Sequence, residues 1–418
     1  MCRFLLLTQA WIEQNLDDLV EIYQHFHANP ELSFQEEKTA AQLSKKWKAI
    51  GAEVTTGIGG YGVVALLRNG DGPVLMLRTD MDALPVTEKT GLKFASKVKT
   101  TSASGDQVGV MHACGHDVHM TNLVGVARYL AVNKDRWRGT LMMVGQPAEE
   151  HLAGAQAMLE EGLFKRFPKP DFAIALHVAP ELADDQVSYR TGYVLANIDS
   201  VDIKIHGKGG HGAYPHTTID PIMQAAQLIL ALQTIVSREV KPIEPAVITV
   251  GSIHHCGTMH NVIGNECNLQ ITVRSYSDNV RQQLLDAIKQ KTNAVAFGAG
   301  ASEPTIKISK GTPSLYNNED LVARVIPVFE RLLGKEKVIV SEPEMGGEDF
   351  SYYGKAGVPI LMYRLGVVDK KRLEHYRQLN QMPPSLHSST FYPDIKETLR
   401  TGVSTMAGAA LELLKPEI

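Results

Sequence analysis

Short apolar runs alternate with amphipathic helical patterns along this 418-residue chain, and that alternation restricts the folds open to it. Strands are predicted at residues 63–67, 74–77, 140–144 and 172–176, and helices are predicted before and between them. Strands that alternate with helices form a sheet with helices on both faces. Open sheets of this kind gather ligands beyond the carboxyl ends of their strands. The sequence therefore predicts an α/β protein.

The first 80 residues supply two helices and a turn signal. Apolar residues at helical spacing predict a helix over 12–26, and a second helix is expected over 36–49. Asparagine-glycine and aspartate-glycine pairs at 69–72 separate the first two strands and are typical of a hairpin. We therefore expect strands 63–67 and 74–77 to pair directly.

Near residue 200 the pattern changes to strands that alternate apolar and polar residues. The expected elements there are a strand at 201–205, a helix at 221–236, strands at 247–253 and 269–273, and a helix at 280–296. This layer has its own apolar set, so residues 197–310 are predicted to form an inserted α+β domain. Residues 1–196 and 311–418 would then form a single domain, completed by strands at 338–340 and 360–363 and a helix at 395–414.

Charge and composition exclude several classes of partner. A net charge of -4 and a pI near 6.4 provide no basic field for nucleic acid. No window reaches the roughly 18–20 apolar residues of a membrane span, and the apolar run at 4–7 is too short for a signal peptide. Four cysteines are too few to predict a disulfide framework, so we expect a reducing compartment and a cytoplasmic location.

The densest cluster of reactive side chains lies at residues 111–119, which hold three histidines, one thiol and one carboxylate. Cys114 and His116 could chelate one ion, because the glycine between them allows a tight turn. Thiolate and imidazole together suit zinc and similar divalent metals. A structural zinc site is the alternative, although such sites usually pair two clusters and no second cluster is present.

Two carboxylate pairs follow predicted strands. Glu149 and Glu150 repel each other unless a cation neutralises one of them, which leaves the other to act on a proton. A solvated helix start explains the same pair without a metal. Asp80 and Asp82 alternate, so in extended backbone they point the same way and one could orient a histidine ligand. A turn is the ordinary explanation for that second pair.

These polar groups converge if their strands are neighbours. Asp80 and Asp82 follow one strand, Glu149 and Glu150 follow another, and His177 closes a third. His177 and His387 are each weak signals alone. Together the clusters supply a full set of metal ligands and a spare carboxylate, which is what metal-assisted hydrolysis requires.

Four motifs, at 78–85, 111–119, 147–150 and 209–215, resemble the aminoacylase and carboxypeptidase family of dimetal peptidases. Within it the chain is similar to the branch of hippurate hydrolases and IAA-amino acid (auxin-conjugate) hydrolases. The resemblance runs in order from residue 29 to His387. It implies a metallopeptidase catalytic domain, with a central mixed sheet flanked by helices, interrupted by a smaller lid and dimerisation domain.

The resemblance also implies roles for residues of the catalytic domain. Its metal ligands match Cys114, His116, Glu150, His177 and His387. Glu149 would be the general base that activates water and returns the proton to the leaving amine, with Asp82 supporting the metal site. One or two divalent ions are expected, manganese or zinc, with cobalt or nickel also compatible.

In the lid, the resemblance implies that His211 steadies the oxyanion in a partner subunit, which predicts a homodimer. Asn261 and Arg274 match positions that hold the substrate carboxylate, for which a guanidinium is well shaped. Without the resemblance, Arg274 is equally well explained as a surface residue at a strand end. Gly264 stands where the branch usually has proline, and the run 254–256 (His-His-Cys) is unusual.

The expected activity is hydrolysis of N-acetyl, benzoyl or indoleacetyl amino acids to a carboxylic acid and a free amino acid. The rival enzyme is a metallo-dipeptidase or carboxypeptidase, which uses the same metal chemistry on a free peptide. A catalytically silent conjugate-binding homologue is a further alternative, and the intact Glu149 argues against it. The residues leave open the acyl group, the amino acid and the metal.

Overall fold

The computed structural model describes residues 2–101 and 105–415 and divides the chain into two compact units. Unit 1 comprises Met1–Gly192, Tyr316–Glu342 and Asp349–Ile418, and unit 2 comprises Tyr193–Leu315 and Pro343–Glu348. Unit 2 thus begins slightly before residue 197 and ends slightly after 310. It also includes the short segment at 343–348, which was expected to belong to the first domain.

Unit 1 is built on an eight-stranded mixed sheet with the order β1-β2-β6-β3-β7-β18-β8-β17. Its strands are β1 (Glu53–Ile58), β2 (Gly62–Asn69), β3 (Val74–Asp80), β6 (Gly139–Gln146), β7 (Phe172–Ala183), β8 (Val187–Tyr189), β17 (Val338–Val340) and β18 (Ile360–Val368). The four central strands β6, β3, β7 and β18 are parallel, and β1, β2 and β8 contribute antiparallel pairs. The predicted α/β class with a central mixed sheet is confirmed.

The predicted hairpin between β2 and β3 is wrong. β6 lies between these strands, antiparallel to β2 and parallel to β3. The glycine-rich turn still reverses the direction of the chain, but the chain passes the first residues of β6 before β3 begins. A Cβ added at Gly72 would lie 3.0 Å from Gly139 Cα, and Thr140 N donates to Pro73 O at 2.9 Å. A turn signal alone cannot show that a later strand will insert between its two arms.

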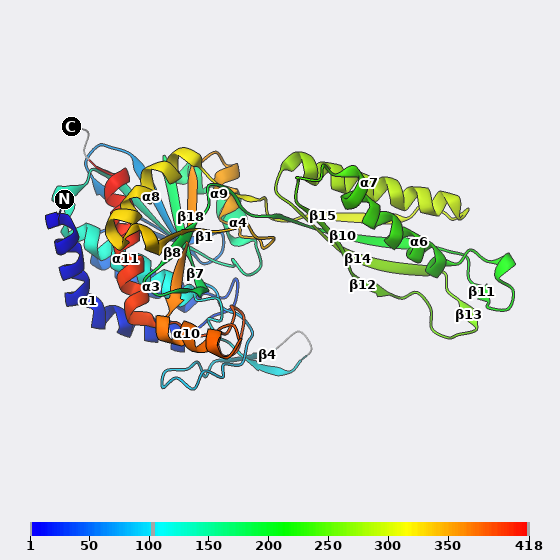
Figure 1. Cartoon of the computed structure of the whole chain (residues 1–418), viewed down its shortest axis with the longest axis horizontal. Helices are drawn as coiled ribbons and strands as arrows, with labels where there is room; N and C mark the ends of the chain where they lie inside the picture. The colour runs from blue at the N-terminus through cyan, green and yellow to red at the C-terminus, as the bar shows by residue number, and fades with distance from the viewer. Residues whose placement is uncertain (1, 102–104, 416–418) are drawn as a thin grey trace. The chain divides into compact units, whose positions relative to one another are not determined.

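The helices of unit 1 enclose a core that the sheet shares with α1, α3, α8 and α11. They are α1 (Cys2–Ala28), α2 (Glu37–Ala49), α3 (His116–Val132), α4 (Gly154–Glu160), α5 (Leu163–Arg166), α8 (Glu319–Leu333), α9 (Ser351–Lys355), α10 (Lys370–Gln378) and α11 (Ile395–Leu413). α1 and α11 lie on one side of the sheet, and α4 and α9 lie on the other (Figure 1). Within the described residues, no helix has the length and apolar character needed to cross a membrane.

Unit 2 is a four-stranded antiparallel sheet, in the order β12-β14-β10-β15, that packs against two helices (Figure 1). Its elements are β10 (Asn197–His206), α6 (Pro221–Thr234), β12 (Ala246–His254), β14 (Glu266–Ser275), α7 (Asp278–Gly298) and β15 (Thr305–Lys310). A separate two-stranded sheet joins β11 (Gly210–His211) to β13 (Val262–Ile263). The remaining short strands are β4 (Lys99–Thr101), β5 (Gln107–Gly109), β9 (Gly192–Leu195) and β16 (Leu315–Asn317).

A disulfide between Cys256 and Cys267 closes the loop that joins β12 to β14. The antiparallel register places His254 opposite Asn268, so the two cysteines lie at the same end of the strand pair. Sequence analysis predicted no disulfide framework, and it did not predict this single bond. A single pair separated by 11 residues has no framework spacing to reveal it in the sequence.

Candidate metal centre and active site

The site lies at the carboxyl ends of three parallel strands. β6, β3 and β7 are neighbours in the sheet, as the convergence of the polar clusters required. Asp80 ends β3 opposite Gln146 of β6, and Glu149 and Glu150 follow β6. His177 does not close its strand as predicted, because β7 continues to Ala183, beyond its pairing with β3. The order of the strands therefore brings all these side chains to one edge.

The five predicted ligands lie within one cluster. Cys114 Sγ is 3.5 Å from His177 Nε2, and Glu150 Oε2 is 3.5 Å from His387 Nε2. Overlapping groups whose donor atoms lie within 4.8 Å of one another link Cys114 to His116 and His177, and link it also to Glu150 and His387. The chain thus gathers one thiol, three imidazoles and a carboxylate from four separate segments.

Backbone geometry explains how Cys114 and His116 both face this cluster. Gly115 sits at the N-terminus of α3 with φ of 77°, a conformation that glycine adopts without steric cost. An added Cβ would also come within 2.5 Å of Val178 Cγ2. His387 has φ of 65°, and its N–H donates to Ala113 O at 2.9 Å, which fixes the distant C-terminal loop against the cluster.

Backbone carbonyls set the tautomers of two histidines. His116 Nδ1 donates to Asp82 O and His177 Nδ1 donates to Val178 O, both at 2.9 Å. A protonated Nδ1 leaves Nε2 as the atom with a free lone pair, which is how ligand histidines are usually oriented. Each of these Nε2 atoms belongs to the ligand cluster.

The residues present fit a divalent cation. Three buried atoms, His116 Nε2, Asp82 Oδ1 and Glu150 Oε1, have no hydrogen-bond partner within the described residues, an expensive arrangement unless a cation compensates. Burial raises the pKa of the Cys114 thiol and of the Glu150 carboxyl, which favours the protonated form of both groups. A nearby cation reverses that preference, and the thiol, imidazole and carboxylate set suits zinc, manganese, cobalt or nickel.

Asp82 links the ligand cluster to neighbouring segments through hydrogen bonds. Its Oδ2 accepts hydrogen bonds from Ser33 Oγ at 2.6 Å and from Glu150 N at 3.0 Å. Burial would raise its pKa, but His116, whose Nδ1 lies 3.3 Å from Asp82 Oδ1, holds that pKa below its ordinary value. Asp82 therefore stays ionised and ties three parts of the site together.

Glu149 is the spare carboxylate beside the ligand cluster. It is 6% exposed, and its Oε2 lies 3.9 Å from His116 Nε2. It lies next to Glu150 in sequence, and its carboxylate is close enough to Glu150 and His116 for the three side chains to bind one metal ion together. A carboxylate in this position could accept and return a proton beside a cation held by the cluster.

A polar layer beneath the cluster was only partly foreseen. His119 Nδ1 and Asp80 Oδ1 are 2.6 Å apart, and His119 Nε2 accepts from Val178 N at 3.0 Å, so both ring nitrogens of this third histidine are occupied. Arg78 is fully buried and donates to Asp80 at 2.8 Å and to Asp349 at 2.9 Å. Neither Arg78 nor Asp349 was predicted to be a site residue. Arg78 was visible in the sequence as a charge inside an apolar strand, whereas nothing in the sequence marked Asp349.

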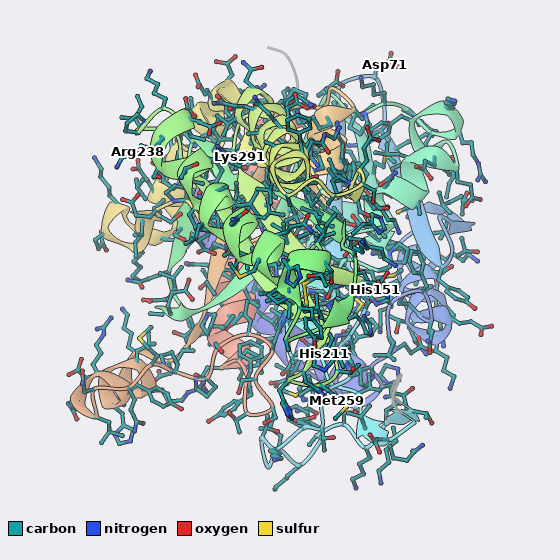
Figure 2. The ribbon with its side chains drawn as sticks, turned by 90° about the vertical axis from the view of Figure 1, so that its right-hand side faces the viewer. Asp71, His151, His211, Arg238, Met259 and Lys291 are labelled. Carbon is teal, nitrogen blue, oxygen red and sulfur yellow. A yellow bond between two sulfur atoms is a disulfide. The ribbon has the colours of Figure 1, made fainter. Side chains whose placement is uncertain are left out.

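The three predicted lid residues lie in unit 2. His211 is exposed in β11 and pairs with Val262 of β13, and Gly212 N donates to Asn261 O at 2.8 Å. Figure 2 labels His211 of this small sheet and Met259, which lies shortly before β13. Arg274 is half-buried in β14, away from these loops, where it donates to Thr272 Oγ1 at 3.2 Å and to Met345 O at 3.4 Å. The structure thus places His211 beside Asn261 and holds Arg274 in the main sheet.

Possible metal ligands gathered at one edge of a mixed sheet, with a second glutamate beside them, are typical of a metal-dependent hydrolase. Comparison with known proteins agrees. The family model "Peptidase family M20/M25/M40" matches residues 76–386. The chain belongs to this peptidase family, and it is a hydrolase of amide bonds.

Similar proteins include amidohydrolases from several bacteria. The chain is 40% identical to N-acetyl-L-cysteine deacetylase of Bacillus subtilis, over 80% of this chain and 77% of that protein. It is 37% identical to hippurate hydrolase of Campylobacter jejuni, over 80% of this chain and 84% of that protein. A crystal structure of the Bacillus subtilis YxeP protein, described as a dinuclear metal-binding M20 peptidase, matches with a TM-score of 0.80 and 28% identity, over 96% of this chain and 99% of that one.

Proposed function

We propose that the chain is a metal-dependent amidohydrolase that cleaves N-acyl amino acids to a carboxylic acid and a free amino acid. The observation that carries the proposal is the carboxylate of Glu149, 3.9 Å from His116 Nε2, beside buried atoms of His116 and Glu150 that have no hydrogen-bond partner in the described part of the chain. The similarity to a deacetylase of N-acetylcysteine and to a hydrolase of hippurate supports the substrate class.

In this proposal Cys114, His116, Glu150, His177 and His387 hold one or two divalent ions, manganese or zinc first among them. The bound metal would polarise the amide carbonyl and make water more acidic. Glu149 removes a proton from the attacking water and delivers it to the leaving nitrogen, while Asp82 keeps His116 and Glu150 in place. Asn261 and Arg274 bind the substrate carboxylate, and His211 stabilises the oxyanion.

We further propose a homodimer formed through unit 2, because α6 carries exposed apolar side chains. Ile222, Met223 and Leu230 are 49%, 56% and 72% exposed. β12 is an open edge strand of the same unit, and edges of this kind are usually covered or paired. Analytical ultracentrifugation should show a dimer, and Leu230→Lys should shift it towards monomer. A monomeric wild-type protein at micromolar concentration contradicts the proposal.

Hydrolysis of a substrate panel tests the activity. Protein stripped of metal and reloaded with zinc, manganese, cobalt or nickel is assayed on N-acetyl, benzoyl and indoleacetyl amino acids and on dipeptides. We expect Glu149→Gln to lower kcat by about 100- to 10,000-fold, the usual contribution of a general base. Glu160→Gln, which changes an exposed carboxylate of the same unit, is the matched control. Preference for dipeptides would favour the peptidase alternative.

The cytoplasmic location stays a prediction, and one observation weighs against it. Disulfides persist mainly in oxidising compartments, and Cys256 and Cys267 form one. Alkylation of free thiols during cell fractionation would report the location and the state of this pair together.

A further inference from the structure

One buried carboxylate outside the ligand cluster touches the turn that carries Glu149. Glu36 lies in the loop between α1 and α2 and is fully buried. Its Oε1 accepts hydrogen bonds from Ala148 N at 2.8 Å and from Phe34 N at 2.9 Å. Ala148 directly precedes Glu149, so Glu36 is one peptide unit away from the proposed base.

Both donors to Glu36 belong to residues with strained backbone. Ala148 has φ of 51° and Phe34 has φ of 60°. A left-handed conformation costs a residue with a Cβ about 1–2 kcal/mol and persists only where the surroundings hold it. The Ala148 carbonyl is occupied as well, because Ala153 N and Gly154 N both approach it at 3.3 Å.

A second carboxylate holds the other side of the same turn. Asp82 Oδ2 accepts from Glu150 N at 3.0 Å, so the two backbone N–H groups that flank Glu149 each donate to a buried carboxylate. Ser33, three residues before Glu36, donates to that Asp82 oxygen at 2.6 Å. The loop at residues 33–36 therefore supports the base from both sides.

The ordinary structural role for Glu36 does not account for its burial. It occupies the N-cap position of α2, yet its side chain makes no capping hydrogen bond. Its Oε2 has no partner within the described residues, and burial raises the pKa of Glu36 to about 7 despite the hydrogen bond from Ala148. A buried carboxylate with no basic partner is costly, so the position of Glu36 needs another explanation.

We propose that Glu36 is a positioning residue that fixes Ala148 in its left-handed conformation and thereby aims the Glu149 carboxylate at the reacting atoms. This inference rests on the proposed role of Glu149 as the base. Glu36 acts on catalysis through the backbone of Ala148 and needs only to accept a hydrogen bond, so its charge is not required.

Three substitutions test the proposal. Glu36→Met keeps the side-chain length but accepts no strong hydrogen bond, and it should lower kcat by about 10- to 100-fold with KM changed less than about threefold, since a small misplacement of a catalytic group acts mainly on rate. Glu36→Gln keeps an acceptor and should retain kcat within about threefold. Glu37→Gln, an exposed neighbour, is the control and should change nothing.

A double variant separates positioning from folding. Glycine adopts a positive φ without cost, so Ala148→Gly should reduce the kcat defect of Glu36→Met. If Glu36→Met does not fold, Glu36→Gln still decides, because a loss of kcat above tenfold there would show that the charge matters and overturn the proposal. Wild-type kcat in a folded Glu36→Met protein would overturn it as well.

Hydrogen exchange distinguishes this inference from the proposed function. Glu36→Met should raise the exchange rate of backbone amides in the peptide at 147–154 by at least about tenfold, whichever substrate the enzyme takes. A wild-type protein that hydrolyses no panel member refutes the proposed function while leaving this measurement valid. Unchanged exchange in that peptide refutes the role of Glu36.

Discussion

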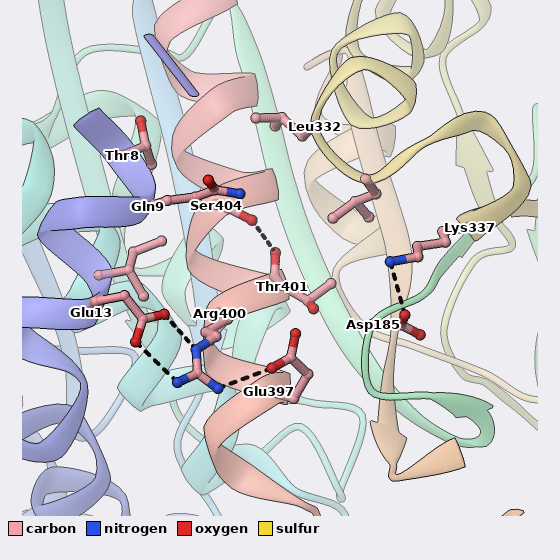
Figure 3. A pocket seen from close by; sticks show the side chains of 12 residues that line it. Thr8, Gln9, Glu13, Asp185, Leu332, Lys337, Glu397, Arg400, Thr401 and Ser404 are labelled. Atoms are coloured by element: carbon pink, nitrogen blue, oxygen red, sulfur yellow. Dashed lines mark hydrogen bonds and ion pairs between the residues drawn. The ribbon is translucent and has the colours of Figure 1, made fainter. Parts of the chain in front are cut away.

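Unit 1 contains two regions rich in charged side chains, and they differ in how their polar atoms are satisfied. The first is the ligand cluster, where buried atoms of His116, Glu150 and Asp82 have no hydrogen-bond partner in the described chain. The second is a cavity of about 300 Å³ between α1, α8 and α11, where the charges are paired with one another. Figure 3 shows Arg400 of this cavity between Glu13 and Glu397, and Lys337 against Asp185.

The difference separates a binding site from a structural feature. In the cavity, Arg400 donates to Glu13 at 2.6 Å and to Glu397 at 3.0 Å, so its charge needs nothing further. In the ligand cluster, several buried polar atoms have no hydrogen-bond partner, and a bound cation would compensate for this. Charge density alone would have marked both regions, whereas the buried atoms without hydrogen-bond partners are more numerous in the first, since Asp185 Oδ1 is the one found among the described lining of the cavity.

The largest effect of a substitution is expected in the ligand cluster. Cys114→Ser should lower metal affinity and abolish most hydrolysis, because it removes the atom that both ligand groups share. A metal present at 100 times its Kd stabilises the folded state by about 2.7 kcal/mol, so wild-type protein should unfold at higher denaturant concentration when reloaded. The variant should lose most of that increment. Equal stabilisation of the two proteins by metal would contradict the assignment.

A buried ion pair at the edge of the site provides an intermediate test. His27 Nδ1 is 2.7 Å from Asp117 and its Nε2 is 3.1 Å from Glu88. Burial would lower the pKa of His27, but the hydrogen bonds to Asp117 and Glu88 raise it to about 9. A raised pKa contributes stability that is complete below the unfolded value of 6.5 and is lost as pH rises towards 9.

We therefore expect the free energy of unfolding to fall between pH 6.5 and pH 9, by at most about 3 kcal/mol from this residue. His27→Gln should flatten that dependence, and His25→Gln, an exposed histidine of the same helix, should not. Denaturant titrations at several pH values measure it. The same slope in wild type and His27→Gln would show that another group titrates.

The smallest effect is expected in the paired cavity. Arg400 and its partners are partly exposed, and exposed ion pairs contribute about 0–1 kcal/mol. Arg400→Gln should destabilise the protein by no more than about 1 kcal/mol and should leave kcat and KM unchanged. A double-mutant cycle with Glu13→Gln measures the pair directly. A clear loss of hydrolysis in Arg400→Gln would break the comparison by linking the cavity to the active site.

The sequence predicted most of the site because its ligands follow strands or belong to local motifs. Cys114 with His116 and Glu149 with Glu150 are visible as clusters, and the order of β6, β3 and β7 brings Glu149 and Glu150 to the edge where Asp80 lies. Features that depend on contacts between distant segments were not predictable. Arg78 with Asp349 and Glu36 with Ala148 join residues far apart in the chain.

Two errors have a common physical origin. The hairpin expected at 69–72 failed because β6 inserts between its strands, and the disulfide was missed because the β12–β14 register was unknown. Both depend on which strands become neighbours. Local turn chemistry and cysteine spacing say nothing about that choice.

The buried thiol of Cys114 also offers a built-in optical label. Of the described cysteine side chains it is the one outside the disulfide, and it belongs to the ligand cluster. A thiolate bound to cobalt absorbs near-ultraviolet light by transfer of charge from sulfur to metal. The absorbance of cobalt-loaded protein should therefore change when the set of atoms bound to the cobalt changes. Binding of an inhibitor or substrate could then be followed by absorbance alone.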